Sequence, residues 1–305
     1  MDESFFILFK EMIWMTANAL NGFLNAEQKW NHHEVTNPLS ILVLNLMPTR
    51  ENTEQQFLTR FSEISTDAEL TFMYPQSHHF RGTSREDIER DYVCLDQIRD
   101  FHYDGLIVTG APVETLPFNQ VDYWNEIETI IDWARTHCTE CLYECWAAQA
   151  CLFHDFGIRK HQLISKLFGI FPADKINPAS EIAQGFVGPE QLRMPQSRHT
   201  SIVLDEDDLP ADLLVDVSSV ETGPIILSSA KRHSTYITGH PEYSEGTLAL
   251  EYYRDLYEQM PIRLPRNYFI DQDSGTVDYS WKSSSIQIYD NWTKIIEKKK
   301  VGLSI

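Results

Sequence analysis

Short apolar runs alternate along the chain with segments whose apolar residues recur at helical spacing. The run Leu39–Leu46 is apolar at six of its eight positions and bounded by prolines, which is typical of a strand buried on both faces. The segment that follows repeats apolar residues from Phe57 to Ile64 behind a polar start at Asn52, and this predicts a helix. Further strands are expected over 70–74, 104–110, 141–144, 225–228 and 235–238, and further helices over 124–134, 146–157 and 245–257, the last long helix.

This alternation indicates an α/β fold, with an open and mostly parallel sheet and helices on both faces. In such sheets, ligands bind beyond the carboxyl ends of the strands. Because the sequence has no internal repeat and no low-complexity linker, we expect a single domain over residues 39–305, preceded by an N-terminal arm of residues 1–38. The apolar residues 5–9 favour a docked arm, and a translation start at Met15 is the alternative.

The charge balance excludes whole classes of function. The 305 residues contain 25 Lys and Arg against 45 Asp and Glu, a formal charge of −20. Binding to nucleic acid requires clustered cations, and the only basic run, Lys298–Lys300, is expected to be a solvated helix end. No apolar run reaches the roughly 18 to 20 residues of a membrane span, and the acidic start does not resemble a signal peptide. We therefore expect a cytoplasmic protein that binds neither nucleic acid nor membrane.

The cysteines are the first candidates for chemistry. Four of the five lie close together, at Cys138, Cys141, Cys145 and Cys151. An odd total without an export signal argues against disulfides, so the thiols are core filler, metal ligands or a nucleophile. A zinc site normally takes its ligands from tight turns, whereas Cys141 and Cys145 fall on a predicted strand and at its end, so we expect no metal. The sequence also lacks the glycine-rich nucleotide-binding motifs.

Cys145 stands between a predicted strand and a predicted helix. A helix N-terminus lowers the pKa of a thiol and can hold a developing oxyanion. Much later, His240 and Glu242 follow another short strand, and their spacing can put an imidazole beside the thiolate with a carboxylate to orient it. From these residues alone, a buried core cysteine and a core histidine remain the alternatives.

Seven segments in a fixed order carry a resemblance to a known family. They are LNLMPTRENTEQQFL, DGLIVTGAPVETLPFNQVDYW, ECWAAQA, KLFG, MPQSRHT, TGHPEY and EYYRDL. Together they resemble the homoserine O-acyltransferases of the MetA type, from about Leu39 to Trp292, roughly four-fifths of the chain. The resemblance implies a fold similar to the class I glutamine amidotransferase domain, with acyl transfer in place of amidotransfer.

The resemblance also implies roles for individual residues. Cys145 matches the acyl-accepting nucleophile, and His240 and Glu242 match the general base and its carboxylate partner, in a ping-pong mechanism. The backbone N–H groups of Trp146 and Ala111 are the expected oxyanion donors. Lys166, Ser197 and Arg254 match positions that contact the amino-acid substrate, and Arg254 suits a bidentate grip on a carboxylate.

Glu114 bears on the acyl donor. In the resembled family, glycine at this position leaves room for a succinyl group, whereas glutamate fills the space and repels the distal carboxylate. The expected donor is therefore acetyl-CoA, as a co-substrate, with no tightly bound cofactor.

The acceptor is less sharply defined, because this chain departs from the family pattern at Tyr143-Glu144, after KLFGIF at 172–175, and at 281–285. A smaller branch that acetylates L-serine is the nearer match, which would place the enzyme in cysteine synthesis, and L-homoserine, the entry to methionine synthesis, is the alternative. A cysteine hydrolase of the glutamine amidotransferase type and a non-enzymatic binding protein represent other classes. A homodimer is the common form of such soluble enzymes.

Overall fold

The computed structural model describes residues 17–80, 82–188, 191–204 and 209–303. The expectations for residues 5–9 and for Met15 lie outside the described residues. No described helix is both long enough and apolar enough to span a bilayer.

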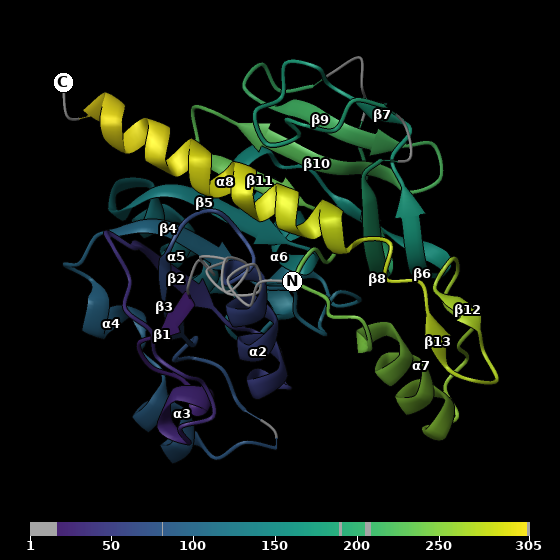
Figure 1. The fold of residues 1–305 in the computed structure, drawn as a ribbon, viewed down its shortest axis with the longest axis horizontal. Helices are drawn as coiled ribbons and strands as arrows, with labels where there is room; N and C mark the ends of the chain where they lie inside the picture. Colours follow the sequence, from purple (N-terminus) through teal and green to yellow (C-terminus); the bar gives the residue numbers. More distant parts are fainter. Residues whose placement is uncertain (1–16, 81, 189–190, 205–208, 304–305) are drawn as a thin grey trace, which may run out of the picture.

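A nine-stranded sheet runs through the molecule, in the order β1-β3-β2-β4-β5-β11-β10-β9-β7 (Figure 1). Its first six strands pair in parallel, and β10, β9 and β7 are added antiparallel at the far edge. The strands are β1 (Ala17–Ala19), β2 (Leu39–Leu44), β3 (Ala68–Met73), β4 (Tyr103–Val108), β5 (Cys138–Glu144), β7 (Lys175–Ile176), β9 (Leu214–Ser219), β10 (Gly223–Ser229) and β11 (Ser234–Ile237). This confirms the open, mostly parallel α/β sheet.

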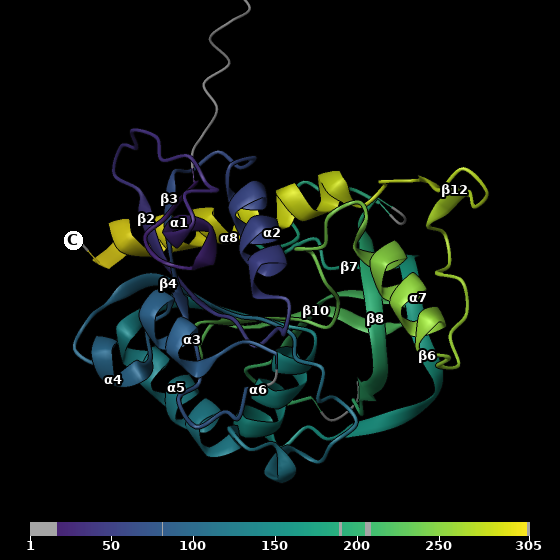
Figure 2. The same ribbon diagram turned by 90° about the horizontal axis from the view of Figure 1, so that it is seen from below.

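Helices cover both faces of the sheet (Figure 2). On one face, α2 and α8 pack against the β2 side chains Ile41 and Val43, whereas α5 and α6 pack against Leu42 and Leu44 on the other. This split follows from the alternation of side chains along a strand and explains why β2 is apolar throughout. The helices are α1 (Phe23–Ala26), α2 (Arg50–Phe61), α3 (Arg85–Asp91), α4 (Leu95–Ile98), α5 (Trp124–His137), α6 (Trp146–Phe156), α7 (Thr247–Tyr257) and α8 (Lys282–Leu303), with the 3-10 turn η2 (Phe118–Gln120).

The N-terminal segment supplies part of this sheet. Ala17–Ala19 forms β1, which pairs in parallel with β3 at the sheet edge, and the Glu54 carboxylate accepts hydrogen bonds from the backbone N–H groups of Phe23 and Leu24 at the start of α1. Residues 17–24, which belong to the expected arm, are therefore joined to β3 and α2 of the expected domain. The boundary between arm and domain remains a prediction.

The last long helix is α8, not the 245–257 segment, so that expectation was wrong. α8 packs across β4, where Trp292 approaches Gly105 so closely that a methyl group there would lie 2.4 Å from the indole ring. Its basic run lies at the helix end with Lys298 and Lys300 exposed, as expected of a solvated helix end, and each of the three lysines also pairs with an acidic side chain. α8 is therefore an integral layer of the fold.

A separate antiparallel ribbon stands at the carboxyl ends of the central strands. It consists of β6 (Lys160–Pro172) and β8 (Arg193–Ile202), with α7 and the small hairpin β12 (Phe269–Asp271) and β13 (Thr276–Val277) beside it. A third apolar cluster, which includes Phe168, Tyr243 and Trp281, fixes this group of elements. The ribbon and α7 bring side chains from far along the sequence to the end of β5.

Candidate active site

Cys145 lies at the junction of β5 and α6, as the sequence predicts. Its backbone has φ 49° and ψ −110°, a conformation that L-residues rarely adopt, and its N–H donates to the Ile237 carbonyl of β11 at 2.8 Å. The side chain is 5% exposed at the N-terminus of α6. The backbone strain and the neighbouring strand therefore hold the thiol at a sharp turn of the kind that presents a nucleophile.

His240 and Glu242 lie beside this thiol. His240 Nδ1 is 2.8 Å from Glu242 Oε1, and the imidazole lies next to the Cys145 side chain. Burial alone would lower the pKa of His240, but the neighbouring Cys145 and Glu242 raise it well above its usual value. The structure thus brings together the cysteine, histidine and carboxylate that the sequence singled out, in the order of a nucleophile, a base and an orienting group.

Gly110 lies close to both Cys145 and His240. A methyl group there would lie 3.1 Å from His240 Cε1 and 3.3 Å from Cys145 Cβ. The adjacent Ala111 begins the loop after β4, and Trp146 is the first residue of α6, whose N-terminal N–H groups have no acceptor within the helix. Both predicted oxyanion donors therefore lie on the segments that flank Cys145.

Glu144, the residue before Cys145, is fully buried behind this arrangement. Tyr289 of α8 donates its hydroxyl to Glu144 Oε1 at 2.5 Å, and the Glu144 carboxyl also contacts that of Glu242. Burial and then the negative charge of Glu242 raise the pKa of Glu144 well above its usual range. The sequence marked Glu144 only as a departure from the family pattern.

Lys166, Ser197 and Arg254 converge on α7. The Ser197 hydroxyl donates to Glu251 Oε2 at 2.5 Å, and Lys166 Nζ lies 3.4 Å from the same oxygen and 3.2 Å from Asp255 Oδ2. Arg254 donates to the other oxygen of Asp255 at 2.6 and 2.8 Å. Two carboxylates and two cations thus alternate in one cluster. Sequence reasoning missed Glu251 and Asp255, although both flank Arg254 in the segment EYYRD.

Tyr243 connects this cluster to His240. Its ring stacks on His240 with centroids 4.2 Å apart, and its hydroxyl donates to Glu251 Oε1 at 2.5 Å. A ligand held by the α7 cluster would therefore lie beside the imidazole.

Glu114 lies in the loop after β4. Its carboxylate accepts from the His199 N–H at 2.8 Å and from the Thr200 hydroxyl at 3.4 Å, so it faces β8. A cavity of about 590 Å³ opens here, lined in part by Phe118, Trp124 and Lys160.

A buried arginine on β8 is another functional candidate that sequence reasoning missed. Arg198 is 1% exposed, and its acceptors among the described residues are all neutral: the Gln196 side chain and two backbone carbonyls. Burial lowers its pKa, and the nearby Cys145 and Glu114 oppose that effect. The positive charge of Arg198 on β8 therefore acts on Cys145. The quoted segment MPQSRHT contains Arg198, but nothing in the sequence indicates its burial.

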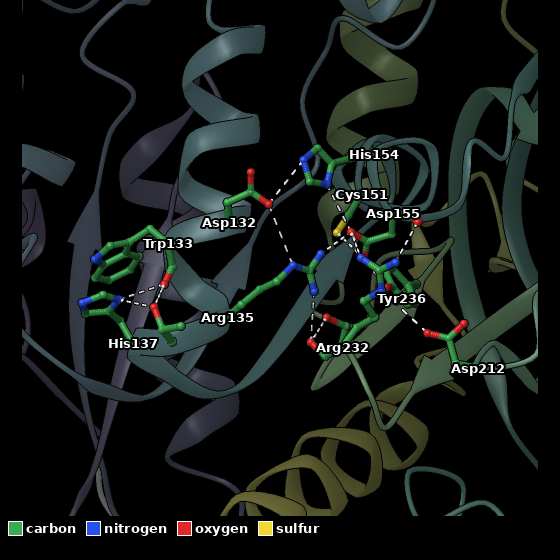
Figure 3. Close-up of polar contacts among 12 residues, drawn as sticks. Asp132, Trp133, Arg135, His137, Cys151, His154, Asp155, Asp212, Arg232 and Tyr236 are labelled. Atoms are coloured by element: carbon green, nitrogen blue, oxygen red, sulfur yellow. Dashed lines mark hydrogen bonds and ion pairs between the residues drawn. The ribbon is translucent and has the colours of Figure 1, made fainter.

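The remaining cysteines are buried away from this site. Cys151 donates to the buried Asp155, which also accepts from Arg135, Arg232 and Tyr236 and so ties α5, α6 and β11 together (Figure 3). All five thiols are free. Among the described residues, no group of three histidine, cysteine or acidic side chains is arranged to hold a metal ion.

Comparison with known proteins identifies the family. A family model described as homoserine O-succinyltransferase matches residues 15–301. The chain belongs to this family. A homoserine O-acetyltransferase from Bacillus licheniformis is 38% identical over 273 residues, 89% of each chain. A homoserine O-acetyltransferase from Bacteroides thetaiotaomicron is 40% identical over 84% of this chain and 83% of its own.

A solved structure gives an independent view of the fold. A glutamine amidotransferase from Thermotoga maritima superposes with a TM-score of 0.56 at 13% identity, over 87% of this chain and all of its own. The class I glutamine amidotransferase-like fold is thereby confirmed for this member of the homoserine O-acyltransferase family. The named relatives support homoserine, given above as the alternative acceptor, and lend no support to the first reading, serine.

Proposed function

We propose that this protein transfers the acetyl group of acetyl-CoA to the side-chain hydroxyl of L-homoserine through a thioester on Cys145. The observation that carries the proposal is the buried Cys145–His240–Glu242 arrangement at a strand–helix junction, in a chain 38% identical to a protein named homoserine O-acetyltransferase. The product would be O-acetyl-L-homoserine, which enters methionine synthesis.

In the first half-reaction, the Cys145 sulfur attacks the acetyl carbonyl carbon. The carbonyl oxygen becomes an oxyanion, for which the N–H groups of Trp146 and Ala111 are the proposed donors. When the intermediate collapses, the bond from carbon to the sulfur of CoA breaks, and His240 gives its proton to the departing thiolate. The raised pKa of His240 suits this step, because the imidazole carries a proton when Cys145 is negative.

Acetylation of Cys145 then prepares His240 for the second half-reaction. The thioester carries no charge, so the attraction between the thiolate and the imidazolium is lost and the pKa of His240 falls. Neutral His240 accepts the proton of the homoserine hydroxyl, whose oxygen attacks the thioester carbon. The bond from carbon to the Cys145 sulfur breaks, and the ester leaves.

The α7 cluster supplies groups of both signs for the acceptor. We assign Arg254 and Lys166 to the carboxylate of homoserine, and Glu251 and Asp255 to its ammonium. Ser197 holds Glu251 in place. Because Tyr243 stacks on His240 and donates to Glu251, it would position the acceptor hydroxyl near the imidazole.

Replacing Glu114 by glycine is expected to let the enzyme use succinyl-CoA, with a rise of at least about tenfold in kcat/KM for that donor. Like charges about 4 Å apart cost about 4 kcal/mol at an effective dielectric near 20, and the Glu114 carboxylate is only partly exposed. Donor choice is measured as CoA release from succinyl-CoA and acetyl-CoA with homoserine.

Glu114→Gln is the matched control, since it removes the charge and keeps the volume. Succinyl-CoA turnover in both variants would attribute donor choice to repulsion, and turnover in the glycine variant alone would attribute it to space. If neither variant uses succinyl-CoA, Glu114 does not select the donor.

A further inference from the structure

Two buried carboxyl groups meet behind the catalytic histidine. Glu242 uses Oε1 for His240 Nδ1, and Glu144 uses Oε1 for the Tyr289 hydroxyl. The other oxygen of each group, Oε2, is shielded from solvent and has no hydrogen-bond donor among the described residues. Because the two carboxyls lie beside each other, a proton on one of them would supply a hydrogen-bond donor that the other can accept.

The charges around the pair also require such a proton. Three groups face Glu144: Glu242 and His240 from the loop after β11, and Tyr289 from α8. Arg60 of α2 acts on Tyr289 from further away. Arg60 is itself paired with Glu63. If both carboxyls were ionised, two buried negative charges would share the single imidazolium, an arrangement that costs far more than holding one proton.

We propose that Glu144 is a protonated positioning residue, which donates a hydrogen bond to Glu242 and thereby fixes the carboxylate that orients His240. Glu242 keeps the negative charge because it faces the imidazole Nδ1–H, whereas Glu144 faces a tyrosine hydroxyl. The O–H of Glu144 withdraws part of the charge of Glu242 and so limits how far that charge raises the pKa of His240.

This arrangement gives a role to Glu144, the residue before Cys145 that departs from the family pattern. Glu144 and Cys145 are consecutive, and Tyr289 comes from α8, so the last helix of the fold supports the catalytic group through two carboxyls. The inference rests on the proposed function for its kinetic test, and its spectroscopic test is independent of turnover.

The decisive variant is Glu144→Gln, because an amide N–H can replace the proposed O–H without changing the charge. We expect kcat within about threefold of wild type and an unchanged pH profile for the acetyl transfer to homoserine. Infrared difference spectra of wild type against Glu144→Gln should show, at neutral pH, the carbonyl stretch of one protonated buried carboxylic acid that the variant lacks. This spectrum is informative even if neither protein turns over.

Glu144→Leu and Tyr289→Phe complete the test. The leucine variant leaves Glu242 Oε2 without a donor, so the full charge of Glu242 raises the pKa of His240, and the rise of kcat with pH should move to higher pH. Tyr289→Phe keeps the proton and should shift the infrared band without removing it, which remains measurable if the leucine variant does not fold.

Two results would overturn the proposal. If Glu144 were ionised, Glu144→Gln would remove a negative charge, move the pH profile to lower pH and show no loss of a protonated carboxyl band. If Glu144 were only structural, the leucine variant would lower stability and leave the pH profile of the folded fraction in place. Failure of the proposed function would instead appear as absence of acetyl transfer in wild type.

Discussion

Replacing Cys145 by alanine is expected to lower kcat for acetyl transfer by at least about 10⁴-fold, because no other group in the site can carry the acetyl intermediate. The sulfur lies at the start of α6 on a residue with a strained backbone conformation, and His240 lies beside it. Without acceptor, wild type incubated with acetyl-CoA should also gain one acetyl group on Cys145, detected by mass spectrometry of the digested protein.

Cys151→Ala is the matched control for this experiment. Cys151 is also buried, six residues further along α6, where it contacts Tyr143 and donates to Asp155, which has stronger partners. The control should keep its activity within a few-fold and still form the acetyl adduct. Multiple turnover by a folded Cys145→Ala protein would rule out the covalent mechanism.

Replacing Glu242 by glutamine is expected to lower kcat by about 10² to 10³-fold. An amide cannot supply the negative charge that stabilises the imidazolium, and its N–H can donate to Nδ1 and hold His240 in the wrong tautomer. Because the charge of Glu242 raises the pKa of His240, its removal should move the alkaline limb of kcat/KM for acetyl-CoA to lower pH. The measurement is CoA release across a pH series.

Glu245→Gln provides the control, since the Glu245 side chain is exposed three residues further on and makes no described polar contact. It should leave both kcat and the pH profile unchanged. An unaltered pH profile in Glu242→Gln would mean that the 2.8 Å contact with His240 does not govern the imidazole during catalysis.

The central strands and the meeting of Cys145, His240 and Glu242 could be predicted because the signals for them are local in the sequence. β2 is a continuous apolar run, and Cys145 and His240 each follow a short strand, so the topology of a parallel sheet brings them to one end. Of α8, only a helix end at Lys298–Lys300 was expected, even though Ile288, Trp292 and Ile296 recur at helical spacing.

Other parts of the site could not be found by pattern. β6 and β8 form a two-stranded ribbon with a register shift between Gln162 and Leu167, so neither strand has a clean alternation of apolar residues. The partners of Glu251 and the burial of Arg198 depend on contacts between elements far apart in sequence. Such contacts become visible only when the chain is folded.

The choice of acceptor tests the account most directly. Purified protein should be offered L-homoserine and L-serine separately over a concentration series with acetyl-CoA, and kcat/KM compared from CoA release. The acceptors differ by one methylene, which is worth about 1 to 3 kcal/mol, so we predict a preference for homoserine of about 10-fold or more. A preference for serine, or turnover with neither acceptor, would contradict the assignment.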